Sequence, residues 1–469
     1  MPQFVDVASN PHLNGIFAPI QDELTDASCE VVQGAIPDDL VGTYVRNGPN
    51  PRFAPIGSYT YPLDGDGMIH AISFFGGRAR YRNRYVRTPS LAAEERAGRA
   101  VWGGVLTPIA PSVDEVGPEL ARKPFRDMPD VHVVRHGGRL LALAEGDLPY
   151  ALTAELSTVG SWDFAGVLAQ GMCAHPKVDP VTGDMVVFRY GFDDPYLSWA
   201  VVGADGVVTR PPVRIDIDAT YMIHDCAITE HYLVLFVCPL CFDLTSKSVL
   251  SWEPDRGTRI AVVRRDVRDS RVRWFETDAF WVWHFANAHE EGADGSCRIV
   301  VDYPHWSHPG FGTAKPAAGG IHRTILHLGT GVVSVEQRDD RMCEFPRIDE
   351  RRLGRGYRYF HAAAKDPDAP GGQGVWNALR RYDLQTGAVA ERRMGREVAL
   401  GEAIFAPAAG ADASDENAGY LLTYAFDIVS LETRCLILAA ADMEAEPVAT
   451  LRMPQRVPFG LHGSWIPGS

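Results

Sequence analysis

Basic residues are in the minority in this chain of 469 residues. Lysine and arginine together number 45 against 60 aspartates and glutamates, which gives a formal net charge of −15 at pH 7. A chain this acidic is repelled by phosphate backbones and by anionic lipid headgroups unless it keeps a local basic patch. We therefore expect no nucleic-acid partner and at most a weak peripheral contact with a membrane.

Long apolar runs are missing as well. No stretch approaches the roughly 18 apolar residues of a membrane-spanning helix, and residues 1–24 lack the basic segment and apolar core of a secretory signal. The eight cysteines do not have the spacing of a disulfide framework. Cys238 and Cys241 form one CxxC pair, which we interpret as two buried thiols because no second pair completes a zinc site. Free thiols without a signal predict a cytoplasmic protein.

Helical patterns are scarce, with residues 90–98 and 112–123 the plausible segments. Short runs of valine, leucine and aromatic residues instead flank glycine-containing turns along most of the chain. Such runs around a Thr-Gly, Asp-Gly or Gly-Gly pair are typical of β-hairpins. The clearest hairpins span residues 74–81, 134–141, 181–187, 202–208, 328–333 and 384–389.

So many hairpins must hide the edges of their sheets. Blades arranged radially in a β-propeller do this, whereas a single β-sandwich could not absorb this number of strands. The composition has no shift that would mark a domain boundary. We therefore predict an all-β chain in which residues 1–469 form one propeller domain, with the helical segments and their loops as a cap.

Most of the 15 histidines need no special role. Those in polar surroundings are expected at the surface or in turns: His12, His136, His231 and His361. His305 and His308 have the spacing of a metal-binding pair, but they lie in a segment rich in proline and glycine without an acidic or thiol partner nearby. A metal at that pair is therefore a poor prediction.

Four other histidines each lie in or beside an apolar segment, far from one another in sequence: His175, His224, His284 and His462. A buried imidazole without a partner loses hydration, so each is either hydrogen-bonded or bound to a metal. Taken singly, a hydrogen-bonded core histidine is the better interpretation. Taken together they point to a metal, because inner strands of different blades converge on a propeller axis.

His284 and His289 lie five residues apart in one strand-like run. An odd offset places two residues on opposite faces of a strand, so only one of them can face a central metal. We assign His284 to that metal and His289 to an outer position.

Glutamates beside apolar residues are candidates to orient the histidines: Glu145, Glu344 and Glu402. A metal-bound histidine normally donates its other ring N–H to a carboxylate or carbonyl. The alternative for each glutamate is a local ion pair, for example Glu344 with Arg347.

Several motifs in order along the chain resemble the carotenoid cleavage oxygenase family. They are RNGPNP at 46–51, LDGDGMIH at 63–70, AHPKVDP at 174–180 and FGLHGSW at 459–465. The resemblance runs from about residue 15 to 469. It implies a seven-bladed propeller with one Fe(II) on its axis, held by His175, His224, His284 and His462 without a carboxylate ligand. It also matches Glu145, Glu344 and Glu402 to three glutamates that orient such ligands, and it places His289 where the family usually has an aromatic residue.

The family cleaves a C=C bond of a conjugated apolar substrate with O2 and releases two carbonyl products. The resemblance therefore implies a dioxygenase that uses iron and O2 but no organic cofactor, and no obligate protein partner is evident. Residues beside the motifs could line an apolar substrate tunnel, with core packing an equally open interpretation for each: Phe53, Phe285, His289, Phe345, Phe405, Phe459 and Trp465.

The substrate class is less sharply indicated. A carotenoid or apocarotenoid is the leading prediction, and a small aromatic alkene of the vinylguaiacol, isoeugenol or stilbene type is the alternative. Family members that cleave hydroxystilbenes resemble one another in a lysine just before the first glutamate, and this chain has Ala144 there. Membrane-associated members carry an apolar helical insertion, whereas residues 88–130 are charged here, so we expect a soluble enzyme.

Other hypotheses remain open beside the dioxygenase. A relative within the family could isomerise or hydrolyse its substrate without consuming O2. A propeller that has lost catalysis could serve as a binding module, although drift would then have erased one of the four histidines or three glutamates. A zinc hydrolase is disfavoured because catalytic zinc normally has three protein ligands and a water, and no general base is evident.

Overall fold

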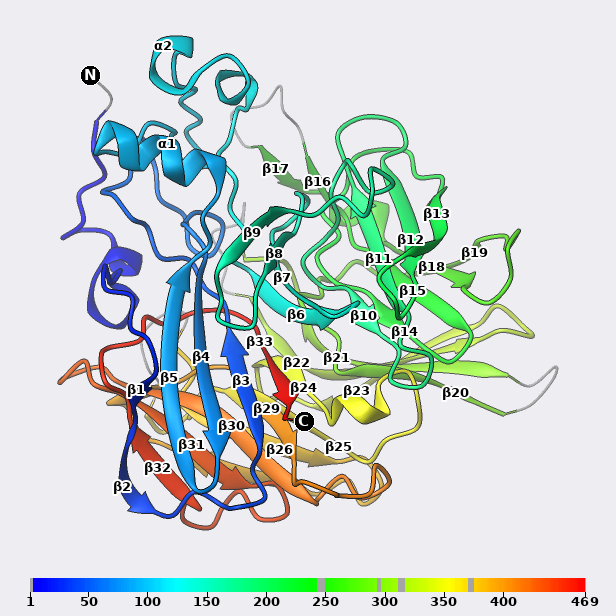
Figure 1. The fold of residues 1–469 in the computed structure, drawn as a ribbon. Coiled ribbons are helices and arrows are strands. Elements are labelled where there is room, and N and C mark those ends of the chain that lie inside the picture. The colour runs from blue at the N-terminus through cyan, green and yellow to red at the C-terminus, as the bar shows by residue number, and fades with distance from the viewer. Residues whose placement is uncertain (1–2, 243–248, 293–296, 311–316, 370–374, 469) are drawn as a thin grey trace. The chain divides into compact units, whose positions relative to one another are not determined.

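The computed structural model describes residues 3–242, 249–292, 297–310, 317–369 and 375–468 (Figure 1). These residues form two compact units, which are treated one at a time. The first unit comprises Met1–Gly171, Glu397–Ala411 and Asn417–Ser469, and the second comprises Met172–Arg396 and Asp412–Glu416. The expectation of one domain over residues 1–469 stays a prediction.

The first unit contains three sheets, with the strand orders β1-β5-β4-β3-β33, β6-β7-β8-β9 and β2-β32-β31-β30-β28, and β29 also pairs with β30. β33 pairs with β3 and sets Gly463 opposite Arg46, which fixes the residue just before the strand, His462. The strands of this unit are β1 (Ala27–Ser28), β2 (Glu30–Gly34), β3 (Gly42–Arg46), β4 (Met68–Phe75), β5 (Arg78–Tyr85), β6 (His132–His136), β7 (Arg139–Leu143), β8 (Tyr150–Leu152), β9 (Thr158–Ser161), β28 (Val398–Leu400), β29 (Ile404–Pro407), β30 (Gly419–Asp427), β31 (Thr433–Ala439), β32 (Ala449–Arg452) and β33 (Gly463–Pro467).

The second unit contains four sheets of four strands, β10 to β13, β14-β15-β18-β19, β20 to β23 and β24 to β27, and the hairpin of β16 and β17. Its strands are β10 (Lys177–Val178), β11 (Met185–Tyr190), β12 (Leu197–Val202), β13 (Val208–Arg214), β14 (Ala227–Ile228), β15 (Tyr232–Val237), β16 (Leu240–Phe242), β17 (Leu250–Trp252), β18 (Thr258–Arg264), β19 (Arg273–Thr277), β20 (Asn287–Glu291), β21 (Arg298–Trp306), β22 (Gly319–His327), β23 (Val333–Asp339), β24 (Cys343–Arg347), β25 (Tyr359–Ala364), β26 (Ala378–Asp383) and β27 (Val389–Arg393).

These seven sheets are antiparallel, and most of their neighbouring strands follow one another along the chain, with exceptions such as β33 beside β3 and β32 beside β2. They are the blades of a seven-bladed β-propeller. The predicted all-β fold is thereby confirmed, and so are the six hairpins. Gly76 and Gly77 adopt φ values of 55° and 67° between β4 and β5, and Gly331 adopts 78° between β22 and β23. Left-handed backbone of this kind favours glycine, which explains why glycine marked the turns.

The two α-helices of the described residues lie in the connection between β5 and β6, where the sequence predicted helical segments (Figure 1). Helix α1 (Pro89–Ala97) begins after Thr88, whose hydroxyl accepts the N–H of Leu91, and ends at Gly98 with φ 66°. Helix α2 (Val113–Val116) is shorter than predicted, because Gly117 ends it. Within the described ranges, no helix has the length and apolar character needed to cross a membrane.

Aromatic packing anchors the chain just before β20. Phe236 on β15 contacts the ring of Phe285 at 4.9 Å between centroids and the ring of Tyr303 on β21 at 5.4 Å. All three side chains are buried in the core of the second unit. This packing holds the segment that carries His284. Cys238 and Cys241 are buried free thiols close to β15, as the sequence predicted.

Candidate metal centre

The second unit places three histidines in the same structural position of three successive sheets. His175 lies two residues before β10, His224 three residues before β14, and His284 three residues before β20. Each of these strands is the first strand of its four-stranded sheet. Each of these three sheets therefore carries one histidine just before its first strand.

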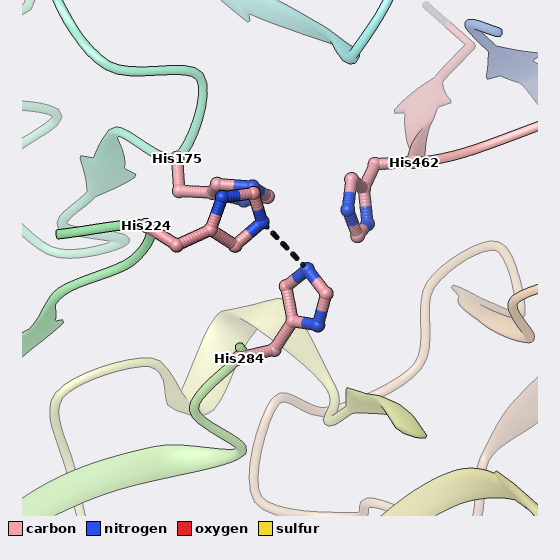
Figure 2. Close-up of side chains that lie close together, drawn as sticks. All are labelled: His175, His224, His284 and His462. Atoms are coloured by element: carbon pink, nitrogen blue, oxygen red, sulfur yellow. Dashed lines mark hydrogen bonds between the residues drawn. The ribbon is translucent and has the colours of Figure 1, made fainter. Parts of the chain in front are cut away.

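The three imidazoles point at one another through the same ring nitrogen (Figure 2). Nε2 of His224 lies 3.1 Å from Nε2 of His175 and 3.3 Å from Nε2 of His284. Two ligands at about 90° around a metal with bonds of about 2.1 Å are about 3 Å apart. The spacing therefore fits cis ligands of one transition-metal ion, and imidazole suits iron, zinc and copper alike.

His462 is the residue just before β33 in the first unit, and its side chain is buried. One ring nitrogen of each of the four histidines lies within 4.8 Å of the others (Figure 2). The four residues that the sequence singled out thus form a group able to hold a metal ion.

A carboxylate orients the ring of His284. Oε2 of Glu344, on β24, accepts from Nδ1 of His284 at 2.6 Å and from the backbone N–H of Phe345 at 2.8 Å. Its Oε1 accepts from the indole N–H of Trp306 at 3.0 Å. With Nδ1 engaged as a donor, Nε2 is left unprotonated and directed at the other histidines. Arg347, the alternative ion-pair partner of Glu344, contacts Glu350 at 3.1 Å.

Glu402 plays the same part for His462 within the first unit. Its Oε1 accepts from Nδ1 of His462 at 2.9 Å, and its Oε2 accepts the N–H of Gly463 at 2.9 Å. Two of the three predicted glutamates therefore have the expected histidine partner. Glu145 follows β7 and is half-buried, and its role stays a prediction.

His289 occupies a different environment from His284. Its Nε2 lies 3.2 Å from Oε1 of Glu291, and its ring meets Tyr357 at 6.0 Å between centroids. The sequence argument placed both histidines on one strand, where an odd offset puts them on opposite faces. That premise was wrong, because β20 begins at Asn287 and His284 precedes it. The chain before β20 is irregular, so the alternation of a strand does not govern it.

The predicted tunnel residues have varied surroundings. Phe285 packs in the core, and Phe459 contacts Phe17 and Phe426 at 5.1 Å each. Phe345 stacks on His284 at 5.7 Å between centroids. Of the remaining candidates, Phe405 is buried, Trp465 contacts Phe74, and Phe53 is half-buried. Their role in a tunnel stays a prediction.

Two features near the histidines were missed in the sequence. Trp306 lies between His305 and His308, the pair that was judged a poor metal site, and its indole N–H donates to Oε1 of Glu344. Asp225 follows His224 directly, and a carboxylate inside an apolar run was a visible signal of a buried partner. That partner is Lys177, whose Nζ lies 2.7 Å from Oδ1 of Asp225.

His136 and His361, expected at the surface, are buried at 6% and 2% exposure. Both lie in strands whose polar neighbours concealed their burial, because alternate residues of a strand face opposite sides. Burial, reinforced by the guanidinium of Arg381, lowers the pKa of His361 to about 3.

This shift predicts a pH-dependent stability. The pKa of an unfolded histidine is about 6.5. Below that pH the unfolded chain binds a proton at residue 361, whereas the folded chain leaves buried His361 neutral, so the free energy of unfolding falls as the pH is lowered. Urea unfolding at about pH 7 and about pH 5 should show the unmodified protein losing about 2 kcal/mol more than His361→Gln. Equal losses would mean that His361 is protonated in the folded chain.

Comparison with known proteins extends the resemblance over the whole chain. The family model described as retinal pigment epithelial membrane protein matches residues 17–467. A carotenoid cleavage oxygenase of Mycobacterium tuberculosis is 32% identical over 98% of both chains. The carotenoid 9,10(9',10')-cleavage dioxygenase 1 of Arabidopsis thaliana is 31% identical over 97% of this chain and 89% of its own length.

Solved structures agree with this result. The lignostilbene dioxygenase of Pseudomonas brassicacearum superimposes with a TM-score of 0.88 at 30% identity, covering 98% of this chain and 99% of that one. A variant of Synechocystis apocarotenoid oxygenase gives 0.84 at 28% identity, covering 96% and 97%. With a propeller of seven sheets and a group of four histidines, this chain belongs to the family of carotenoid cleavage oxygenases.

Proposed function

We propose that this protein is a non-haem Fe(II) dioxygenase that cleaves a C=C bond of a carotenoid or apocarotenoid and releases two carbonyl products. One Fe(II) per chain would be held by His175, His224, His284 and His462. The observation that carries the proposal is the convergence of Nε2 atoms, 3.1 and 3.3 Å apart, with no thiolate or carboxylate among the grouped ligand atoms of the described residues.

The donor set fits iron on chemical grounds. Four neutral imidazoles would leave a bound ion dipositive, and imidazole is a ligand that suits iron. When bound, iron supplies the site at which O2 is activated. An alkene and O2 contain all the atoms of two carbonyl products, so the reaction needs no reductant and no net proton transfer.

The residues of the chain then have positioning roles. Glu344 and Glu402 hold the Nδ1 protons of His284 and His462, which fixes both tautomers with Nε2 free to bind metal. Phe345 covers one face of the His284 ring, so water reaches that ligand less readily. No side chain is required as a nucleophile or as a general base.

The names of the relatives support a carotenoid substrate, since both curated relatives are carotenoid-cleaving enzymes by name. A small aromatic alkene is the second candidate, because the lignostilbene dioxygenase superimposes with a TM-score of 0.88 against 0.84 for the apocarotenoid oxygenase variant. Ala144 weakens this second reading, since hydroxystilbene-cleaving members have a lysine there. We further infer a single catalytic domain that acts in the cytoplasm without an obligate protein partner, and the eight free thiols support a reducing compartment.

Metal analysis combined with O2 uptake tests the proposed function. Purified protein loaded with Fe(II) is given a long apocarotenal or a small 4-hydroxyphenyl alkene, and aldehydes are identified by mass spectrometry. We expect about one iron per chain and one pair of carbonyl products for each O2 consumed, with the apocarotenal as the better substrate. Product without O2 uptake would indicate an isomerase or hydrolase. No uptake on either substrate would favour a binding module.

A further inference from the structure

We propose that Lys177 and Asp225 form a buried brace that positions the three metal-binding histidines of the second unit. The inference rests on the proposed function only in taking His175, His224 and His284 as ligands of one metal ion. Lys177 and Asp225 would be positioning residues, since their contacts are with the segments that carry the ligands.

The carboxylate of Asp225 joins three segments that are distant in sequence. Its Oδ1 accepts from Nζ of Lys177 at 2.7 Å and from the backbone N–H of Cys226 at 2.7 Å. Its Oδ2 accepts the backbone N–H of Phe285 at 2.9 Å. Lys177 is two residues after His175, and Phe285 directly follows His284. One side chain therefore fixes the chain beside each of the three histidines.

The need for such a brace follows from the local backbone. The three histidines lie outside the strands, so the regular hydrogen bonds of a ladder do not set their positions. Metal binding needs all three Nε2 atoms unprotonated, and at separations of 3.1 and 3.3 Å their lone pairs then repel one another. A metal relieves this repulsion once bound. Before binding, other contacts must hold the rings together. Glu344 orients the ring of His284, and the brace holds the chain beside all three histidines.

The burial of the ion pair between Lys177 and Asp225 indicates that the pair positions the ligand segments more than it stabilises the fold. The side chains of Lys177 and Asp225 are 16% and 2% exposed. Removing two charges from water costs about as much as their attraction returns, so a buried ion pair is weak evidence for stability. A pair that bonds across three ligand segments instead preorganises the metal site, which is where such contacts have their largest effect.

Asp225→Asn provides the principal test. The amide keeps the size of the carboxylate but has only one acceptor oxygen. It therefore cannot accept the hydrogen bonds of Lys177 and Cys226 at one atom and that of Phe285 at the other. Metal-free protein is titrated with Co(II), and the ligand-field absorption gives both affinity and coordination. We expect about 10–100-fold weaker binding with an altered absorption spectrum. Lys177→Met, which leaves the two backbone bonds intact, is expected to weaken binding by a smaller factor.

Asp339→Asn is the matched control. Asp339 pairs with Arg380 at 2.6 Å, and both side chains are 10% exposed in the same unit. This variant should lower the unfolding midpoint as Asp225→Asn does but keep the Co(II) affinity of the unmodified protein. Wild-type affinity and spectrum in Asp225→Asn and Lys177→Met would overturn the brace. If Asp225→Asn does not fold, Lys177→Met decides the question.

The two proposals fail in different ways in this experiment. Unmodified protein that binds neither Co(II) nor Fe(II) would contradict the proposed function. Unmodified protein that binds Co(II) tightly while both brace variants bind it equally well would contradict the brace alone.

Discussion

Replacing His284 with alanine is expected to abolish iron binding and, with it, cleavage of any alkene. The substitution removes one of the converging Nε2 donors, which lies 3.3 Å from that of His224. It also leaves the carboxylate of Glu344 without the imidazole that it contacts at 2.6 Å, so a buried negative charge loses a partner. Iron per chain, measured by emission spectrometry after reconstitution with Fe(II), should fall from about one to the background level.

His289→Ala is the control for this result. His289 is buried, as a ligand would be, but its Nε2 contacts Glu291 and its sequence position is five residues away. This variant should retain its iron and change only how substrate is handled, which a comparison of KM with kcat would reveal. Full iron retention by His284→Ala would overturn the ligand assignment, and iron loss by His289→Ala would contradict the separation of the two histidines.

Glu344→Gln is expected to weaken iron retention by about 10–100-fold without preventing folding. The carboxylate accepts from His284, Phe345 and Trp306 through its two oxygens. Glutamine has one oxygen and an NH2 group, so one of these donors must face another donor. If the indole keeps the oxygen, the ring of His284 turns or changes tautomer, and Nε2 no longer points at the metal. Competition with a chelator of known affinity gives the ratio of dissociation constants.

Glu290→Gln is the matched comparison for this variant. Glu290 also contacts a histidine in the same unit, with Oε2 at 3.1 Å from Nδ1 of His231, but His231 is not among the four grouped histidines. We expect Glu290→Gln to bind iron as the unmodified protein does. Equal iron affinity in Glu344→Gln and Glu290→Gln would mean that Glu344 supports the fold and does not tune the metal site.

Much of the fold could be predicted because its signals are local. A glycine pair such as Gly76 and Gly77 between two apolar runs specifies a hairpin from its own backbone preferences. The helix over Pro89–Ala97 was likewise indicated within a few residues. The number of blades followed from the family resemblance and not from the hairpins, whose spacing is irregular.

The histidines of the candidate site could be predicted from the sequence, but the contacts that hold them in place could not. His175, His224, His284 and His462 were selected because each imidazole stands in an apolar context, which is visible in the sequence. The burial of His361 escaped the same reasoning because its strand has polar neighbours. The relation of His284 to His289 was derived from a strand that begins only after His284.

The sequence by itself determined the hairpin architecture, the four histidines and the glutamates that orient His284 and His462. Only the tertiary structure decided that Trp306 binds Glu344 and that Asp225 joins the segments of His175, His224 and His284. The physical reason is that a hydrogen bond between distant segments depends on the registers of several sheets at once. No single segment encodes such a bond, whereas a turn or a buried imidazole is encoded where it stands.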